Sequence, residues 1–255
     1  HTSPEANVAA IRALITPRTK VIQVSHITCT TGLVFPVRAI ADLAAERGIW
    51  FHIDGAQSVG MIPVNFTRIG CDSYAFSGHK WLGGPHESGV LYIRRDRLDA
   101  VAATGIGAHS GALEYLPGEL LLDDGAARHE YGTRNAGLIA GLTEAVRFQE
   151  AIGRERIAAH GQAMAGHLLE ELSRIPGITV LTPRPAEMRG SMTTITHARV
   201  KAGRLFSYLW DKHGLRCRPV TEQGLQAVRI STHVFNSPAE CERVIAGVRA
   251  ASRDL

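Results

Sequence analysis

The sequence predicts an α/β fold, with a mostly parallel central sheet covered by helices on both faces and a smaller C-terminal α+β domain. Over the first 135 or so residues, short β-branched apolar segments alternate with amphipathic ones, the pattern of a parallel sheet covered by helices. After that point the order changes to long helices followed by short strands. Of the 255 residues, 45% are hydrophobic and 20% are charged. The chain can therefore bury a sizeable core and is not disordered as a whole.

The first half contains four predicted strands and one clear helix. Lys20–Ser25 is short, apolar and β-branched, as strands are. Pro36 begins a helix with apolar positions at helical spacing, and Gly48 ends it. The near-continuous apolar run Ile49–Ile53 predicts a strand that is buried on both faces. Two further short strands are expected, at Ser73–Phe76 and Ser88–Arg94.

The second half opens with an amphipathic helix at Leu138–Ile152, which Gly153 ends. We expect the domain boundary inside or just after this helix, so that residues 1–140 and 141–255 form the two domains. The elements predicted after it are helices at Glu155–Leu172, Gly203–His213 and Pro238–Ala251, and strands near Thr179–Leu181, Met192–Thr196, Leu215–Pro219 and Ala227–Ser231.

Composition excludes several classes of function. No apolar run approaches the ~18–20 residues of a membrane span, and the opening residues show no signal peptide. The net charge is mild, 28 − 24 = +4, and aromatic residues make up only 6%, so a nucleic-acid partner is poorly supported. Four widely separated cysteines form no C-x-x-C, which argues against a zinc site and a disulfide framework. We therefore expect a cytoplasmic protein that holds no metal and binds neither membrane nor nucleic acid.

Three segments with reactive polar side chains follow predicted strands: Ser25-His26, Asp54–Ser58 and Ser77–Lys80. Ligands of open α/β sheets bind beyond the carboxyl ends of the strands, so a carboxylate, a lysine, two histidines and a hydroxyl are expected to face one crevice. A lysine and a carboxylate on neighbouring strand ends suit pyridoxal phosphate (PLP), since the amine forms a Schiff base and the carboxylate pairs with the pyridinium nitrogen. Singly, such residues are usually a turn aspartate and a surface lysine; together they are much more specific.

The residues of these segments resemble motifs of the class V aminotransferase family, and most closely those of its isopenicillin N epimerase-like and cysteine desulfurase-like branches. The family consists of fold-type I PLP-dependent enzymes, so the resemblance implies the PLP-dependent transferase fold, with residues 1–140 as the C-terminal part of the large PLP-binding domain. No stretch matches the N-terminal portion of the family, which carries a phosphate-binding helix start and a ring-stacking residue. The matching stretches are HIDGAQS (52–58), SGHKWLGGP (77–85) and EYGTRN (130–135), with SHITCTTG (25–32) and VRISTHVFN (228–236).

The resemblance assigns roles around the cofactor. Lys80 would be the Schiff-base lysine, Asp54 would pair with the pyridine nitrogen, and Gln57 would hydrogen-bond the ring hydroxyl oxygen. The small side chain of Ala56 would let the ring lie flat on the strand end. The phosphate would be bound by two residues of the third segment, Ser77 and His79.

The resemblance also assigns residues to the substrate and to a partner subunit. Arg229 would clamp the substrate α-carboxylate, for which a bidentate guanidinium is suited. Thr133 would reach the phosphate in the partner subunit, which implies a homodimer with shared active sites. Cys29, His86 and His109 are further candidates for substrate contact, although His86 fits a solvated turn equally well.

The predicted function is that of a PLP-dependent enzyme acting on a small-molecule amino acid or amino-acid conjugate, similar to isopenicillin N epimerase. Lys80, displaced by the substrate amine in an external aldimine, would remove the α-proton as a general base. The sequence leaves open whether the reaction ends in epimerisation (isomerase), elimination (C–S lyase) or transamination (transferase).

The sequence disfavours two other functions and one mechanism. A non-catalytic scaffold would have no need of the Schiff-base lysine, and a nicotinamide oxidoreductase lacks its G-x-G-x-x-G fingerprint. A desulfurase with a cysteine nucleophile is also expected to be excluded. The interval Val220–Gln226, where desulfurases carry that cysteine, has none, and Cys217 before it is expected to be a packed thiol.

Overall fold

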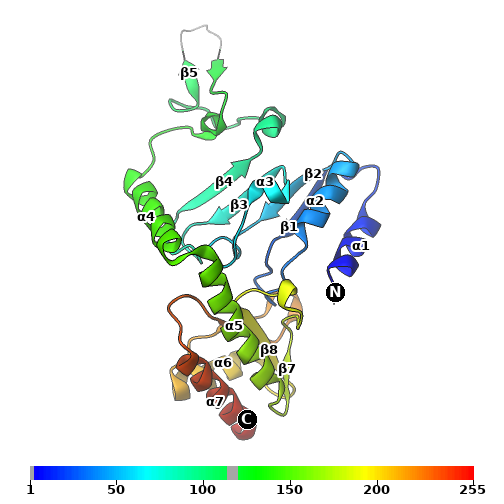
Figure 1. The fold of residues 1–255 in the computed structure, drawn as a ribbon, viewed down its shortest axis with the longest axis vertical. Coiled ribbons are helices and arrows are strands. Elements are labelled where there is room, and N and C mark those ends of the chain that lie inside the picture. Colours follow the sequence, from blue (N-terminus) through cyan, green and yellow to red (C-terminus); the bar gives the residue numbers. More distant parts are fainter. Residues whose placement is uncertain (1–2, 114–119) are drawn as a thin grey trace.

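The computed structural model describes residues 3–113 and 120–255, which form two four-stranded sheets arranged along the long axis of the molecule (Figure 1). The first sheet has the strand order β1-β2-β3-β4, in which the first three strands are parallel and the fourth is antiparallel. This mixed sheet, with helices on both sides, confirms the predicted α/β class. Its strands are β1 (Val21–Ser25), β2 (Trp50–Asp54), β3 (Ser73–Ser77) and β4 (Gly89–Ile93).

The helix α2 (Val37–Glu46) packs its apolar face on this sheet. Its buried residues sit at helical spacing and join Phe51 and Ile53 of β2 in one hydrophobic cluster. A short helix, α3 (Phe66–Ile69), packs beside it. The remaining buried members of the cluster are Ile22, Val37, Ile40, Ala41, Ala44, Ile49, Ile69, Cys71 and Tyr74.

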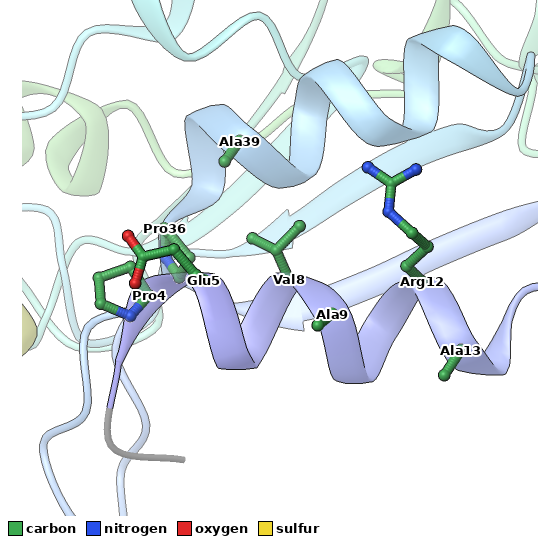
Figure 2. A pocket seen from close by; sticks show the side chains of 8 residues that line it. All are labelled: Pro4, Glu5, Val8, Ala9, Arg12, Ala13, Pro36 and Ala39. Atoms are coloured by element: carbon green, nitrogen blue, oxygen red, sulfur yellow. The ribbon is translucent and has the colours of Figure 1, made fainter.

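An additional helix, α1 (Pro4–Leu14), was not predicted from the sequence. Ser3 caps it by accepting a hydrogen bond from the Ala6 amide, and Pro4 occupies the first turn, a common way for a helix to begin. Figure 2 shows Val8 and Arg12 pointing from α1 toward α2, where the two helices border a largely apolar groove.

The strand β2 differs from the prediction of burial on both faces. Only Phe51 and Ile53 are buried, while Trp50, His52 and Asp54 are half-buried. The half-buried face is polar: Trp50 Nε1 donates to Ser73 Oγ at 2.9 Å, and His52 Nδ1 lies 2.8 Å from the same oxygen. The prediction was wrong because amphipathic Trp and His side chains were counted as apolar.

In the sequence, the segment that connects the two sheets forms a projecting arm and two long helices. The arm carries the antiparallel hairpin of β5 (Gly111–Leu113) and β6 (Leu120–Leu122), visible at the top of Figure 1. The helices α4 (Ala136–Ile152) and α5 (Arg154–Ser173) follow, separated by Gly153. The expected boundary at 140/141 therefore falls within α4 and stays a prediction. Short 3₁₀ turns lie at Arg95–Ala100 and Ala126–His129.

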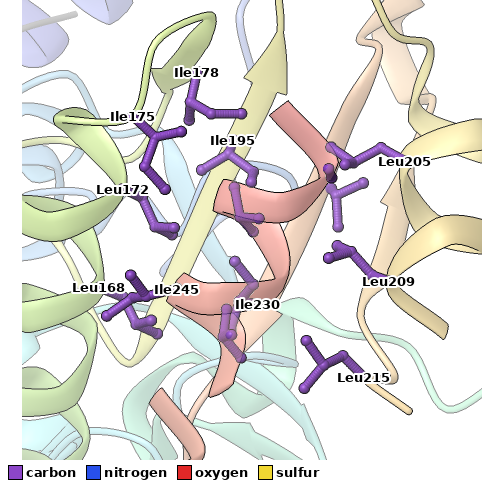
Figure 3. Packing of buried hydrophobic residues seen from close by; sticks show 14 of the residues in the cluster. Leu168, Leu172, Ile175, Ile178, Ile195, Leu205, Leu209, Leu215, Ile230 and Ile245 are labelled. Atoms are coloured by element: carbon purple, nitrogen blue, oxygen red, sulfur yellow. The ribbon is translucent and has the colours of Figure 1, made fainter. Parts of the chain in front are cut away.

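The second sheet is antiparallel, with the order β7-β8-β10-β9. Leu168 and Leu172 of α5 pack against Ile195 and Ile230 of this sheet, and Figure 3 shows these side chains with those of the last helix. The elements are β7 (Ile178–Val180), β8 (Met192–His197), α6 (Ala202–His213), β9 (Arg218–Val220), β10 (Ala227–Ser231) and α7 (Pro238–Asp254), with 3₁₀ turns at Ala186–Met188 and Glu222–Gly224.

The two layers meet at the loop that follows β1. Thr194 Oγ1 donates to the carbonyl of Thr30 at 2.7 Å, and Thr182 Oγ1 donates to that of Thr31 at 2.7 Å. A small apolar cluster seals the junction, with Ile27, Met61, Trp81 and Met192. These contacts fix the loop that carries Cys29 against the second sheet. No helix in the described part of the chain is long and apolar enough to cross a membrane.

Candidate active site at the junction of the two sheets

Asp54 lies at the carboxyl end of β2, level with Ser25 on β1 and Ala75 on β3. Its Oδ1 accepts a hydrogen bond from the Ala56 amide at 2.9 Å, and its Oδ2 accepts from Ser25 Oγ at 3.3 Å. Because each carboxylate oxygen has more than one acceptor position, both retain capacity for a further donor. A carboxylate thus lies at the carboxyl end of the central strand β2, as the sequence predicted.

The turn after Asp54 needs glycine at position 55. A Cβ on Gly55 would lie 1.9 Å from the ring of Tyr74, so no larger residue fits without moving β3. The Tyr74 hydroxyl lies 2.5 Å from Ser58 Oγ and 2.8 Å from Nδ1 of His26, which is itself buried. Burial lowers the pKa of His26 to about 4. His26 therefore supports the turn through the Tyr74 hydroxyl. It does not face the crevice at the strand ends, where the sequence had led us to expect two histidines.

Gln57 and Trp81 orient each other. Trp81 Nε1 donates to Gln57 Oε1 at 2.8 Å, which leaves the amide NH₂ of Gln57 free to donate elsewhere. The Trp81 carbonyl in turn accepts from Gln149 Nε2 at 2.6 Å and from His233 Nε2 at 2.7 Å. These bonds from α4 and from the segment after β10 hold the chain beside Lys80 in place.

A cleft of about 570 Å³ lies where these segments meet. It brings together four of the predicted site residues, Cys29, Gln57, Lys80 and Arg229. Sequence reasoning gave no role to the others. Trp81 and His233 stood inside the quoted motifs, whereas Arg218 had no signal beyond its charge. The cleft is completed by Trp81, Arg218, Ser231, His233 and Phe235.

Arg229 reaches the cleft from β10 with part of its guanidinium engaged. Its Nη1 donates to the carbonyl of Cys29 at 2.6 Å. Its Nε is buried and has no acceptor among the described residues. Burial, and next the nearby charge of Arg218, lower the pKa of Arg229. Nη1 of the guanidinium is thus anchored to backbone, and its Nε keeps an unused capacity to donate, for example to a carboxylate.

Asp54, Ala56 and five further predicted residues lie outside the lining of this cleft. Ser77 is half-buried at the end of β3, and His79 is exposed with its ring centroid 6.1 Å from that of His86, which is also exposed. Thr133 is exposed two residues before Asn135, the residue that caps α4. His109 is exposed on the loop that leads into β5. The roles assigned to all five stay predictions.

The donor set around the cleft fits pyridoxal phosphate. The ring needs a carboxylate for its nitrogen, a donor for its hydroxyl oxygen and an amine for its aldehyde. Asp54 has spare acceptor capacity, Gln57 has a free amide NH₂, and Lys80 lines the cleft. The residues present therefore match the group.

Comparison with known proteins agrees with this geometry. A family model described as aminotransferase class-V matches residues 2–244. The chain is 30% identical over 254 residues to isopenicillin N epimerase of Streptomyces clavuligerus, covering 94% of this chain and 62% of that protein. It is 35% identical over 243 residues to probable cysteine desulfurase 2 of Mycobacterium leprae, covering 92% and 57%. The chain thus spans about 60% of the length of the curated relatives it matches.

Solved structures show the same fold. The apo cysteine desulfurase of Thermococcus onnurineus superposes with a TM-score of 0.86 at 28% identity, covering 92% of this chain and 60% of that one. The cystine C–S lyase C-DES, in complex with its product cysteine persulfide, superposes with a TM-score of 0.85 at 24% identity, covering 95% and 64%.

These relatives contradict the expected exclusion of a cysteine desulfurase. The exclusion rested on the interval Val220–Gln226 without a cysteine, on a packed Cys217, and on Cys29 in place of the Asn that is usual in desulfurases. The structure folds the interval as a short link between β9 and β10. Cys217 beside it does pack against the core, and burial raises its pKa to about 11. However, the cleft receives a different thiol, Cys29 from the loop after β1. The absence of a cysteine from this interval does not exclude a desulfurase, because residues reach the cleft from several segments.

Proposed function

Since this chain belongs to the class V aminotransferase family, whose cofactor is pyridoxal phosphate, we propose that the whole protein acts on the α-carbon of an amino acid or amino-acid conjugate. The observation that carries the proposal is the convergence of Lys80, Gln57 and Arg229 on one cleft, with Asp54 three residues before Gln57 at the end of β2. A scaffold that only binds a partner would have no use for an amine, an oriented amide and a half-free guanidinium in one place.

When bound, the cofactor supplies an aldehyde that condenses with amines and a protonated ring that withdraws electrons from the substrate α-carbon. Asp54 holds the proton on the ring nitrogen, and the free NH₂ of Gln57 donates to the ring hydroxyl oxygen. Arg229 grips the substrate α-carboxylate and sets the torsion about the bond between the α-carbon and the nitrogen. That torsion would select which bond to the α-carbon is broken.

Lys80 moves the proton. As a free amine, its Nζ would remove the α-proton of the bound substrate as a general base. Return of a proton to the opposite face of the α-carbon inverts the amino acid. We propose this epimerase ending, which is supported by the relatives named isopenicillin N epimerase that align with 94% and 98% of the chain.

A second candidate ending is cleavage of a C–S bond in a sulfur-containing amino acid. It is supported by the relatives named cysteine desulfurase and by the thiol of Cys29 in the cleft. Transamination, in which the proton returns to the cofactor, needs no residue beyond those already named.

The proposal includes a homodimer in which Thr133 serves the site of the partner subunit, and a reducing, cytoplasmic location. The four cysteines, Cys29, Cys71, Cys217 and Cys241, are all free thiols, as is usual in a reducing compartment.

The test uses the full-length protein. We expect it to be yellow, and borohydride reduction followed by peptide mapping should place the cofactor on Lys80, with no label in Lys80→Ala. Incubation in D₂O with single enantiomers of a panel of amino acids then distinguishes the endings. α-Deuteration with inversion supports epimerisation, and sulfide release supports C–S cleavage. A cofactor label on another lysine, or none, would refute the proposal.

A further inference from the structure

Two arginines approach the cleft from directly opposed positions on neighbouring strands. Arg218 of β9 pairs with Arg229 of β10 in the antiparallel register, and both side chains line the cleft. Opposed Cα atoms of such a pair are only about 4.5–5.5 Å apart. The two guanidinium groups are therefore within reach of one small ligand.

Each guanidinium has donors that the protein leaves unused. Nη1 of Arg218 and Nε of Arg229 are both buried, and neither has an acceptor among the described residues. The contacts that the protein does supply are a carboxylate of Glu222 for Arg218 Nη2 and a carbonyl for Arg229. Buried donors without acceptors are costly, so their presence at the wall of a cleft points to acceptors that come from a ligand.

The positive charges in the cleft also favour an anionic ligand. Arg218, Arg229 and Lys80 line it together, and no carboxylate is among the lining residues. Burial, and next the charge of Arg218, lower the pKa of Arg229. Like charges directly opposite each other on neighbouring strands are destabilising, and Glu222 supplies a counter-charge only at Nη2 of Arg218. A ligand with one carboxylate can satisfy the guanidinium of Arg229 in a bidentate manner, and the buried Nη1 of Arg218 would still lack an acceptor.

We propose that Arg218 forms a second anion subsite, so that the substrate carries another carboxylate in addition to the one held by Arg229. The substrate class is then a dicarboxylic amino acid, or a conjugate with a carboxylate at comparable distance. This inference rests on the proposed function for the role of Arg229, although the pairing of the two arginines does not depend on it.

Non-covalent probes test the subsite without turnover. Glutarate carries two carboxylates, and glutaramate is nearly the same molecule with one of them replaced by a neutral amide. Isothermal titration of the full-length holoprotein should show that glutarate binds at least tenfold more tightly than glutaramate. Both probes lack an amine, so neither can react with the cofactor.

Variants then assign the preference to a residue. Arg218→Gln should weaken glutarate binding at least tenfold and leave glutaramate almost unchanged, which removes the preference. Arg229→Gln should weaken both probes. Arg216→Gln is the matched control, because Arg216 lies two residues away and is exposed; it should alter neither. Circular dichroism confirms that each variant is folded.

Two results would overturn the subsite. Equal binding of glutarate and glutaramate by the wild type would show that no second carboxylate is recognised. Equal weakening of both probes by Arg218→Gln would show that the two arginines share a single carboxylate. Failure of the proposed function is seen separately, since it is read from the cofactor label on Lys80; a dicarboxylate preference in a protein without that label would keep the subsite and refute the PLP chemistry.

Discussion

At the scale of single residues, backbone carbonyls orient the side chains of the cleft. The Cys29 carbonyl holds Arg229, and the Trp81 carbonyl holds both Gln149 and His233. These acceptors come from loops whose positions depend on the junction of the two layers. Sequence motifs identified Arg229 and Lys80, but they carry no information about which carbonyl each side chain meets.

Arg229→Lys tests this anchoring. Lysine carries the same charge but has no planar fork, so it cannot bind the Cys29 carbonyl and a carboxylate in the geometry that the cleft provides. Truncating one partner of such a charge pair costs roughly 2–5 kcal/mol, and we expect kcat/KM to fall at least tenfold. The visible absorption band of the bound cofactor should persist. Unchanged turnover of every amino-acid substrate would mean that the carboxylate is held elsewhere.

His26 gives the protein a pH dependence that is independent of catalysis. Its pKa is about 4 in the folded protein and close to 6.5 when unfolded. Between these values the unfolded chain binds more protons, so the free energy of unfolding rises with pH over this window and falls on acidification. The loss between pH 6.5 and pH 4 reaches at most about 3 kcal/mol.

The check is denaturant unfolding at pH 5 and pH 7. His26→Gln should show a smaller difference between the two pH values than the wild type, even if it is less stable at both. An equivalent change at the exposed His109 should leave the difference as it is. A pH difference that survives His26→Gln would assign it to other groups.

At the scale of elements, the long helices and most of the short strands were predicted to within one or two residues, and a few elements were missed or displaced. The helices α4 and α5 lie where the apolar spacing placed them. The strand expected at Leu215–Pro219 is instead Arg218–Val220, because Leu215 turns into the core directly after the helix-ending Gly214. That shift hid the pairing of Arg218 with Arg229, since strand register depends on tertiary packing.

The last helix, α7, offers a test of local stability. Ser237 forms a capping box with Glu240: its side chain accepts from the Glu240 amide, and the Glu240 carboxylate accepts from the Ser237 amide. Ser237→Ala should lower the free energy of unfolding by about 1 kcal/mol, whereas Ser237→Asp should retain most of it. Thermal denaturation followed by circular dichroism measures both. A loss of equal size in the two variants would mean that the cap contributes little.

At the scale of the whole molecule, α4 and β4 expose several large apolar side chains. Ile139 and Phe148 of α4 are each 61% exposed, and Leu91 of β4 is 52% exposed. Thr133 lies just before α4. An interface over α4 would cover its apolar side chains and carry Thr133 toward a second copy, as the family motif implies. We expect a homodimer burying more than ~2,000 Å² with an apolar centre, which sedimentation can detect.

Mixing two inactive variants tests whether the sites are shared. Lys80→Ala lacks the Schiff-base amine, and Thr133→Glu places a negative charge where the partner's phosphate would lie, so each homodimer should be inactive. In a dimer with shared sites, the mixed dimer contains one site built from an intact Lys80 and an intact Thr133. Because random mixing of equal amounts makes half of the dimers mixed, about a quarter of the wild-type activity should return. If Lys80 and Thr133 instead served the same subunit's site, both sites of the mixed dimer would be defective and no activity would return. Co-expression followed by tandem purification with two tags isolates the mixed dimer and measures its activity directly.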